Sequence, residues 1–176
     1  MHIRLFTKYY FINNFDTNNL QKQDKETIII FRNYSSSNIR IDKLIKLKNF
    51  LRKQGNKFFL ANNFKLALKL GLDGVYIPSF NKNFNHLAYS TFPNFTVVGS
   101  AHNLKEIRIK ELQKAKTIFI SSLFKKNNNY LGLNKFKILN NYTKKNVVAL
   151  GGISKKNIKK IKLLKISGIA GISYFG

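Results

Sequence analysis

The chain contains no cysteine and no tryptophan, and it has one methionine and two prolines among its 176 residues. Without cysteine, neither a disulfide framework nor a thiolate metal site can form. No apolar run approaches the ~18 residues that a membrane-spanning helix needs. The N-terminal segment MHIRLFTKYYFINNF alternates charged, aromatic and apolar residues, unlike a signal peptide. We therefore expect a cytoplasmic protein without a membrane segment.

Acidic residues are also scarce: seven Asp and Glu stand against 32 Lys and Arg, which gives a formal net charge of +25. A strongly basic chain suggests nucleic acid as a partner. The basic residues are, however, mostly lysine, spread along the whole chain without a recognition motif, so nucleic acid is the less favoured partner. Abundant Lys, Asn and Ile, whose codons are A/T-rich, fit compositional drift. Small anionic ligands fit either interpretation.

The rest of the composition is that of a globular protein, with 44% hydrophobic and 14% aromatic residues, and we expect one domain over residues 1–176. Short apolar runs predict eight strands at 9–12, 27–31, 57–60, 74–77, 96–98, 117–120, 146–150 and 168–172. Helical patterns separate most of them, at 42–54, 63–70, 104–115, 133–142 and 154–166. This alternation predicts a parallel α/β fold, and eight repeats predict a closed (β/α)8 TIM barrel.

The predicted barrel is lean, because about 200 residues is near the lower end for this fold. Residues 13–26 are polar and show no convincing helix, and Gly176 follows the eighth predicted strand almost directly. We therefore expect the first and last helices to be short or missing. An apolar face left open by the missing helix would leave room for a homodimer.

Residues 146–173 fit the order strand, glycine turn, basic helix and strand. Gly151 and Gly152 follow an apolar strand directly, and Ser154 is placed to cap the following helix. The loops after the seventh and eighth strands of a (β/α)8 barrel often bind phosphate, and exposed amides favour an anion. The alternative is a simple βαβ unit whose glycines serve packing alone.

Four sequence segments occur in a characteristic order: VGSAHNLKE at 98–106, LAL at 66–68 followed by GLDGV at 71–75, GGI at 151–153, and GIAGIS at 168–173. Together they resemble the thiamine-phosphate synthase family, which includes the thiazole tautomerases, and the chain looks like a divergent member. The resemblance implies a (β/α)8 fold and a transferase of thiamine biosynthesis. Such an enzyme joins a pyrimidine pyrophosphate to a thiazole phosphate and releases pyrophosphate with Mg²⁺.

The resemblance also implies roles for particular residues. It places Arg32 on the pyrophosphate side and Ser100 where it would orient the leaving group or substrate. It assigns the phosphate of the thiazole to a cradle that the chain retains, formed by Gly151, Gly152, Ile172 and Ser173. A phosphorylated small molecule is therefore the expected partner.

The chain departs from the family pattern on the pyrimidine and pyrophosphate side. Asn62 and Asn81 stand where the family has metal-binding acids, and Asn33 and Tyr34 replace an acid and a lysine. Lys125 and Lys126 belong to a loop that replaces the family's loop after strand six, and they could offset pyrophosphate charge in place of a metal. Because a Mg²⁺ site needs carboxylates, we assign no metal ligand and leave Mg²⁺ open as a cofactor.

His102 is the one histidine near a predicted strand end, and it is chemically suited to act as a general base. The alternative is that it caps the following helix or packs under the loop. Ser122 stands where the tautomerases have their catalytic histidine. His2 and His86 carry no signal, and the three histidines cannot be argued into a metal site by spacing.

Three functions remain open. The first is a thiamine-phosphate-synthase-like transferase that binds a thiazole phosphate and couples it to a pyrimidine pyrophosphate. The second is a non-catalytic or repurposed family member that binds a phosphate ligand. The third, less favoured, is a basic nucleic-acid-binding protein on this scaffold.

Overall fold

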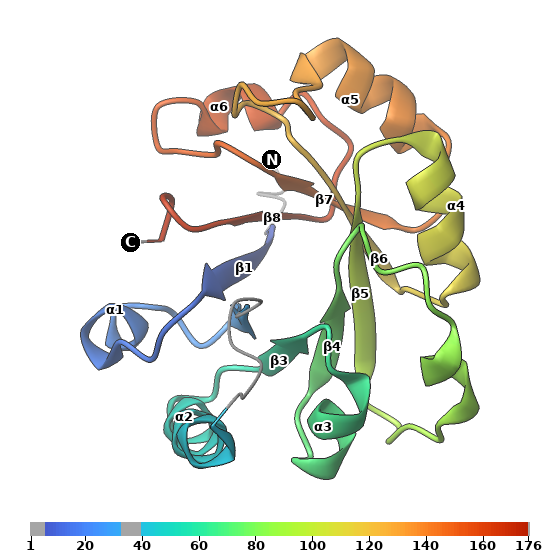
Figure 1. Ribbon diagram of the computed structural model, residues 1–176. Helices are drawn as coiled ribbons and strands as arrows, with labels where there is room; N and C mark the ends of the chain where they lie inside the picture. Colours follow the sequence, from blue (N-terminus) through green and yellow to red (C-terminus); the bar gives the residue numbers. More distant parts are fainter. Residues whose placement is uncertain (1–5, 33–39, 176) are drawn as a thin grey trace.

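The computed structural model describes residues 6–32 and 40–175, in which eight parallel strands close into a barrel. Neighbouring strands pair in chain order, and β8 pairs with β1. The strands are β1 Thr7–Ile12, β2 Thr27–Phe31, β3 Phe58–Ala61, β4 Gly74–Ile77, β5 Thr96–Ala101, β6 Thr117–Ile120, β7 Asn146–Leu150 and β8 Gly168–Gly171. Figure 1 looks into this ring of strands, with the helices outside it. The predicted (β/α)8 barrel is confirmed, and each strand lies within three residues of its predicted bounds.

The helices that cover the strands are mostly short. They are α1 Thr17–Gln21, α2 Ile41–Gln54, α3 Phe64–Lys69, α4 Leu104–Leu112, α5 Gly132–Asn141 and α6 Ile158–Ile161, and a 3₁₀ helix, η1 Asn85–Ala88, follows β4. Asp16 caps α1 with its carboxylate, which lets the polar segment after β1 form one helical turn. The described residues after β8, 172–175, contain no helix. The first helix is therefore short, as predicted, and the described residues after β8 form no further helix.

The helix predicted over 154–166 is wrong in length, because only Ile158–Ile161 is helical. Ser154 is not its N-cap: its own N–H donates to Asn157 Oδ1 at 2.9 Å, which holds the preceding residues in a turn. The segment also carries lysines at 155, 156, 159 and 160 with no acid among them. Like charges four residues apart destabilise a helix, which explains why the apolar pattern is not sufficient here.

Aromatic side chains fill the inside of the barrel. Tyr9, Phe11, Phe59, Tyr76 and Phe119, from four different strands, belong to one buried cluster. The Tyr9 and Phe119 rings pack edge-to-face with centroids 4.7 Å apart, and those of Phe11 and Tyr76 do so at 5.0 Å. The barrel interior is therefore a packed core and not a ligand cavity.

Two further clusters pack the helices onto the outside of the strands. One joins α2 and α3 to the first four strands, and the other joins α4 and α5 to the last four. After β8, Phe175 packs against the first cluster and Tyr174 against the second, and Gln23 Nε2 donates to the carbonyl of Phe175 at 2.9 Å. The segment after β8 is thus attached to both outer clusters, and the homodimer stays a prediction.

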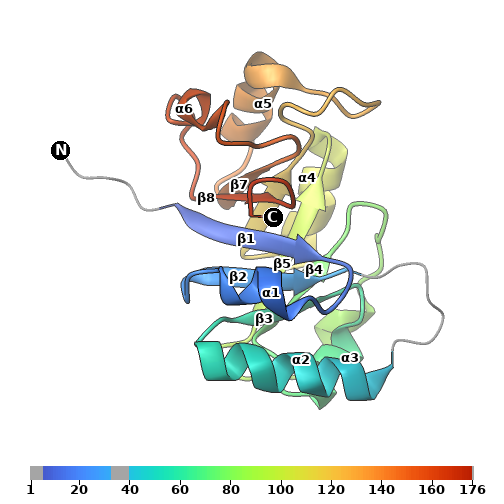
Figure 2. The ribbon, with the colours of Figure 1, turned by 90° about the vertical axis from the view of Figure 1, so that its left-hand side faces the viewer.

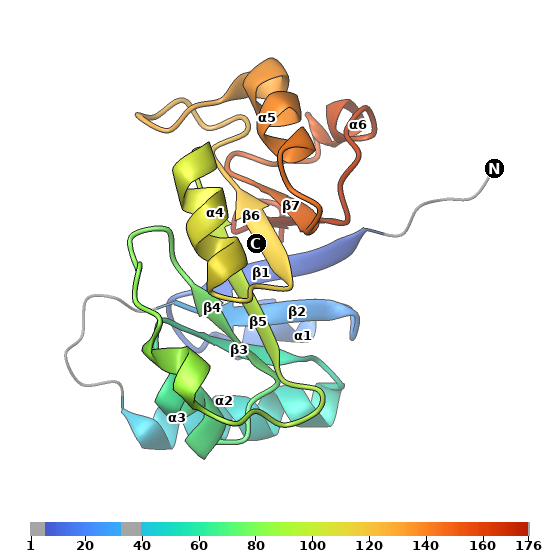
Figure 3. The ribbon, with the colours of Figure 1, turned by 90° about the vertical axis from the view of Figure 1, so that its right-hand side faces the viewer.

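The carboxyl ends of all strands meet at one end of the barrel, which we call the mouth. Figures 2 and 3 show from two opposite sides that the loops after β4 and β6 project at this end. Within the described ranges, no helix is long and apolar enough to cross a membrane.

Candidate active site

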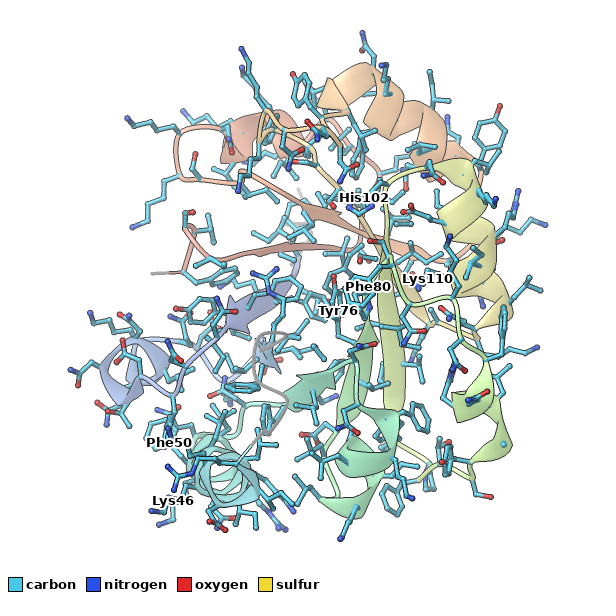
Figure 4. All side chains as sticks on the ribbon, viewed as in Figure 1. Lys46, Phe50, Tyr76, Phe80, His102 and Lys110 are labelled. Atoms are coloured by element: carbon cyan, nitrogen blue, oxygen red, sulfur yellow. The ribbon has the colours of Figure 1, made fainter. Side chains whose placement is uncertain are left out.

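Three strands bring a cation and two hydroxyl groups together at the mouth. Arg32 follows β2, and its guanidinium carbon lies 5.3 Å from the centroid of the Phe11 ring. Tyr76 of β4 is buried in the barrel (Figure 4) and shares a hydrogen bond with Ser100 of β5. Arg32 and Ser100 were predicted as site residues, and Tyr76 was not. The positive charge of Arg32 therefore lies next to the aromatic side chains of the barrel.

Tyr76 cannot serve as an ionised group here. Burial raises its pKa to about 12, although the hydrogen bond with Ser100 and the charge of Arg32 act in the opposite direction. Its hydroxyl therefore stays protonated at neutral pH and fixes the orientation of the Ser100 hydroxyl.

The glycine turn after β7 has the backbone conformation that its sequence predicts. Gly151 and Gly152 have φ angles of +101° and +72°, in the region that side chains disfavour. A Cβ on Gly151 would lie 2.4 Å from Ser122 Oγ, and one on Gly152 would lie 2.5 Å from the Lys125 amide nitrogen. Only glycine fits at either position, because the loop after β6 packs directly against the turn.

The same contacts leave the amides of the turn available. The Gly151 carbonyl accepts from Phe124 N at 2.8 Å, and the Gly152 carbonyl accepts from Asn157 Nδ2 at 2.8 Å. By contrast, the N–H groups of Gly151, Gly152 and Ile153 donate to no acceptor in the described part of the chain. With the oxygens held by protein and the N–H groups free, the turn is suited to an anion.

The other predicted cradle and loop residues lie near this turn. Ile172 and Ser173 follow β8 and are exposed. Lys125 and Lys126 are exposed in the loop after β6, and the Lys125 carbonyl accepts a hydrogen bond from Ser122 Oγ at 2.9 Å. Lys125 and Lys126, which the sequence analysis assigned to the pyrophosphate side, therefore have their backbone beside the glycine turn and their side chains exposed.

His102 is tied to the start of α4. Its backbone N–H and its ring Nδ1 lie 2.7 and 2.9 Å from Glu106 Oε2, and Asn103 Oδ1 accepts from Glu106 N at 2.9 Å. Asn103 is therefore the N-cap of α4, and His102 is held at the residue before it by Glu106 without capping the helix itself. Because Glu106 engages Nδ1, ring Nε2 is left for a substrate, and the general-base role stays a prediction.

Asn62 and Asn81, where the family has metal-binding acids, face each other across the ends of β3 and β4. Asn81 Nδ2 donates to Asn62 Oδ1 at 2.7 Å, and Asn81 Oδ1 accepts from the Asn83 N–H at 2.8 Å. Each of the two oxygens that could coordinate Mg²⁺ already accepts one hydrogen bond within the protein. The described residues also contain no group of three or more His, Asp or Glu side chains that could hold a metal ion. This pair does not fit Mg²⁺, which requires several oxygen ligands.

A buried lysine stands behind this pair. Lys110 of α4 has no exposed surface, and its Nζ donates to the Asn81 carbonyl at 2.7 Å and to Gln113 Oε1 at 2.8 Å. Its aliphatic chain passes β5 at Gly99, where a Cβ would lie 2.7 Å from Lys110 Cδ. Figure 4 shows Lys110 between β5 and α4. Burial lowers the pKa of Lys110 to about 8, with Glu106 acting in the opposite direction, so it is mostly charged at neutral pH.

Gln113, also fully buried, completes the support of the loop after β4. Its Nε2 donates to the carbonyls of Asn81 and Asn83 at 3.1 and 2.7 Å, and its own carbonyl lies 2.9 Å from His86 Nε2. Sequence reasoning missed both Lys110 and Gln113. Lys110 falls three residues after Ile107 and so shares its face of α4, but the apolar residues of this helix do not gather on one face, so the sequence contains no clear signal.

A pocket of about 220 Å³ lies beside the asparagine pair, outside the barrel. Its base contains Val75 and Ile77 from β4, and its walls come from α3 and the segment that contains η1. The polar residues that line it are Asn62, Asn63, Lys65, Asn81, Asn83, Asn85 and His86. No acidic side chain lines the pocket. Asn33 and Tyr34, which the resemblance also singled out, lie outside the described residues.

A closed (β/α)8 barrel carries its binding loops at the carboxyl ends of the strands, and the glycine turn after β7 is one of these loops. The sequence model of the family described as thiamine monophosphate synthase matches residues 18–175. The chain belongs to this family.

Individual relatives agree at modest identity. The chain is 34% identical to the putative thiamine-phosphate synthase 2 of Aquifex aeolicus over 140 residues, which covers 76% of this chain and 74% of that protein. It is 30% identical to the thiamine-phosphate synthase of Picrophilus torridus over 183 residues, with 96% and 85% covered. The match to the Methanococcus vannielii thiamine-phosphate synthase is 29% identical over 120 residues and covers 66% of this chain. It spans 58% of the length of that relative.

Among solved structures, the thiamine phosphate pyrophosphorylase from Pyrococcus furiosus superposes with a TM-score of 0.76 at 23% identity. The superposition covers 97% of this chain and 88% of that chain. At this identity the likeness supports the fold.

Proposed function

We propose that this protein binds a thiazole phosphate at the glycine turn after β7 and couples it to a pyrimidine pyrophosphate, in thiamine biosynthesis. The observation that carries the proposal is the turn itself, with two glycines at positive φ and three N–H groups without a protein acceptor. The chain is a member of the family, and the turn lies at the position for which the family resemblance implies phosphate binding. Ile172 and Ser173, exposed at the end of β8, supply the other side of the cradle.

In the coupling step, a bond forms between the thiazole and the methylene carbon of the pyrimidine as the C–O bond to pyrophosphate breaks. The electron pair of that bond leaves with the pyrophosphate, so negative charge grows on the leaving oxygen. Arg32 is the cation at the mouth that stabilises this charge, and stabilisation of this kind is usually the largest catalytic contribution. Ser100, oriented by Tyr76, positions the reacting group, and the exposed Lys125 and Lys126 add positive charge.

A thermal melt at low salt tests ligand binding, with inorganic phosphate present in every sample so that simple anion effects cancel. Hydroxyethylthiazole phosphate and thiamine phosphate are then added separately. A ligand at about 100 times its dissociation constant adds roughly 2.7 kcal/mol to the free energy of unfolding, which shifts the melting temperature by several degrees. No shift above the phosphate background for either ligand would refute the proposal.

A second candidate, binding without turnover, is favoured by the asparagine pair that replaces the metal-binding acids. It predicts the same thermal shift but no thiamine phosphate when thiazole phosphate and pyrimidine pyrophosphate are incubated with the protein. Formation of thiamine phosphate above an Arg32→Met control would decide for the transferase.

A further inference from the structure

The asparagine-lined pocket beside β4 offers hydrogen-bond donors rather than acceptors. Asn62 Oδ1 is used by Asn81, Asn63 Oδ1 caps Leu66 N at 3.1 Å, and Asn83 Oδ1 accepts from the Asn85 N–H. The Nδ2 groups of Asn62, Asn63 and Asn83 have no acceptor within residues 6–32 and 40–175. Each of these oxygens keeps one lone pair, but the N–H donors of the three amides are all unpaired among the described residues, so the donors outnumber the free acceptor positions.

The charged groups near the pocket also favour an anion over a divalent cation. Lys65 lines the pocket, and the ammonium group of Lys110 lies 2.7 Å from the Asn81 carbonyl, directly behind the pair. A divalent cation bound at Asn81 would be repelled by this buried charge, whereas an anion would be attracted. The nearest carboxylate on α4, that of Glu106, is already engaged by His102 and Asn103.

The base of the pocket strengthens these interactions. Val75 and Ile77 are buried apolar residues, and hydrogen bonds gain strength where the surroundings are poorly polarisable. Lys110 and Gln113 fix the backbone of the wall at Asn81 and Asn83, and hydrogen bonds to Asn81 Nδ2 and to Leu66 N orient the side chains of Asn62 and Asn63. Binding then costs less conformational entropy.

We propose that this pocket binds a phosphate-type oxyanion directly, through the amide donors of Asn62, Asn63 and Asn83 and the charges of Lys65 and Lys110, without a divalent cation. Exchange of two acids for two asparagines has inverted the preference of the site from cation to anion. The identity of the anion rests on the proposed function, under which it is the diphosphate of the pyrimidine substrate. Inorganic phosphate is the other anion that offers the same oxygen acceptors.

Isothermal titration with inorganic pyrophosphate and with inorganic phosphate, in EDTA at fixed ionic strength, tests the proposal. The wild-type protein is expected to bind in EDTA. The double variant Asn62→Asp/Asn81→Asp restores the acids, and Asp tolerates the φ of +58° at position 62. We expect it to bind at least tenfold more weakly in EDTA and to recover when Mg²⁺ is added. Tighter binding of pyrophosphate than of phosphate would assign the site to the leaving group, and the reverse to a free anion.

The matched control is Asn49→Asp/Asn134→Asp, which makes the same charge change at two exposed helix positions. It is expected to bind within twofold of the wild type, which separates the pocket from attraction to a basic surface. Wild-type binding that requires Mg²⁺, or equal binding by the two double variants in EDTA, would overturn the proposal.

If the restored-acid variant does not fold, side-chain amide signals of wild-type protein give a second measurement. Pyrophosphate in EDTA should shift the Nδ2 resonances of Asn62, Asn63 and Asn83, and shifts confined to other asparagines would contradict the proposal. Hydroxyethylthiazole phosphate is titrated in parallel. If it fails to bind while pyrophosphate binds in EDTA, the proposed function is lost and this inference stands. If it binds while pyrophosphate requires Mg²⁺, only the inference is lost.

Discussion

The two regions proposed to bind anions are built from different parts of the chain. The glycine turn after β7 presents backbone N–H groups, and its shape is set by two residues without side chains. The rim between β3 and β4 presents side-chain amides, and its character depends on which atom stands at the end of each side chain. The family resemblance implies a phosphate cradle at the first region and metal-binding acids at the second, where asparagines stand in this chain.

This difference shows that a site built from side chains can change its ligand preference by substitution more easily than a site built from backbone N–H groups. Exchange of a carboxylate oxygen for an NH₂ group reverses what a side chain attracts while its volume hardly changes. No such exchange can alter the glycine turn, because any side chain at Gly151 or Gly152 meets the loop after β6. The following predictions test this contrast, from the largest expected effect to the smallest.

Gly151→Ala should damage the backbone-built region most. The added Cβ would lie 2.4 Å from Ser122 Oγ and 2.9 Å from Ser122 Cα, at a φ of +101°. We expect a loss of about 2–5 kcal/mol in the free energy of unfolding from strain and overlap together, and loss of thiazole-phosphate binding. Urea unfolding and a thermal shift measure both. Gly171→Ala is the control, since a Cβ there meets nothing within 4 Å, and equal losses in both variants would contradict the argument.

Lys110→Met should abolish a pH dependence of stability that belongs to the side-chain-built region. The pKa of Lys110 is about 8 in the folded protein against 10.5 as its ordinary value, so between these pH values the unfolded chain holds more protons. Raising the pH from 8 to 10.5 therefore stabilises the wild type, by at most about 3 kcal/mol from this group. Below pH 8 the burial penalty is fully present.

The measurement is the free energy of unfolding in urea at several pH values in this window, for the wild type and the variant. The difference between the two curves removes the contribution of the other lysines. Parallel curves would show that Lys110 keeps an ordinary pKa in the folded protein. A parallel pyrophosphate titration should show wild-type affinity falling as the pH passes about 8, because the charge behind Asn81 is lost.

Gly99→Ala should loosen the β3–β4 rim and leave the glycine turn intact. Its Cβ would lie 2.7 Å from Lys110 Cδ and 3.0 Å from the Ile77 carbonyl oxygen, so Lys110 must move. We expect about 1–3 kcal/mol of destabilisation, weaker pyrophosphate binding and unchanged thiazole-phosphate binding. Combination with Lys110→Ala removes the overlapping side chain, and the double variant should lose less stability than the sum of the single ones. Strict additivity would mean that the overlap is relieved elsewhere.

Glu106→Gln should have the smallest effect. The carboxylate accepts from the His102 N–H, lies 2.9 Å from His102 Nδ1, and accepts from Asn103 Nδ2 at 3.1 Å. An amide keeps one acceptor atom, so a loss of about 1 kcal/mol is expected in urea unfolding. Both anion-binding regions should bind as in the wild type. A change in thiazole-phosphate affinity would show that His102 reaches the ligand.

The barrel could be predicted from the sequence because its strands are short, apolar and separated by turns. The runs at 27–31, 74–77, 117–120 and 146–150 became strands with the predicted bounds. The sequence was also sufficient for the glycine turn, because consecutive glycines after a buried strand have few structural explanations. It failed for the helix at 154–166, where repulsion among lysines and a local Asn157–Ser154 hydrogen bond outweighed the apolar pattern.

The supporting residues of the site were not predictable from the sequence. Lys110 resembles any surface lysine of a basic chain, and only the tertiary structure shows that it reaches the Asn81 carbonyl 29 residues earlier in the sequence. Tyr76 resembles a strand core residue, and its link to Ser100 depends on β4 and β5 pairing in register. Contacts of this kind depend on the closed barrel and leave no periodic signal.

The position of Tyr76 gives the protein an optical probe of its own. Since the chain has no tryptophan, its intrinsic emission comes from its eight tyrosines. Tyr76 is one of three buried tyrosines among the described residues and the one whose pKa responds to the charge of Arg32, and it stays un-ionised up to a pH of about 12. An anion drawn to Arg32 changes the electric field at this phenol, so binding can be followed by tyrosine fluorescence without any label. A Tyr76→Phe variant supplies the blank.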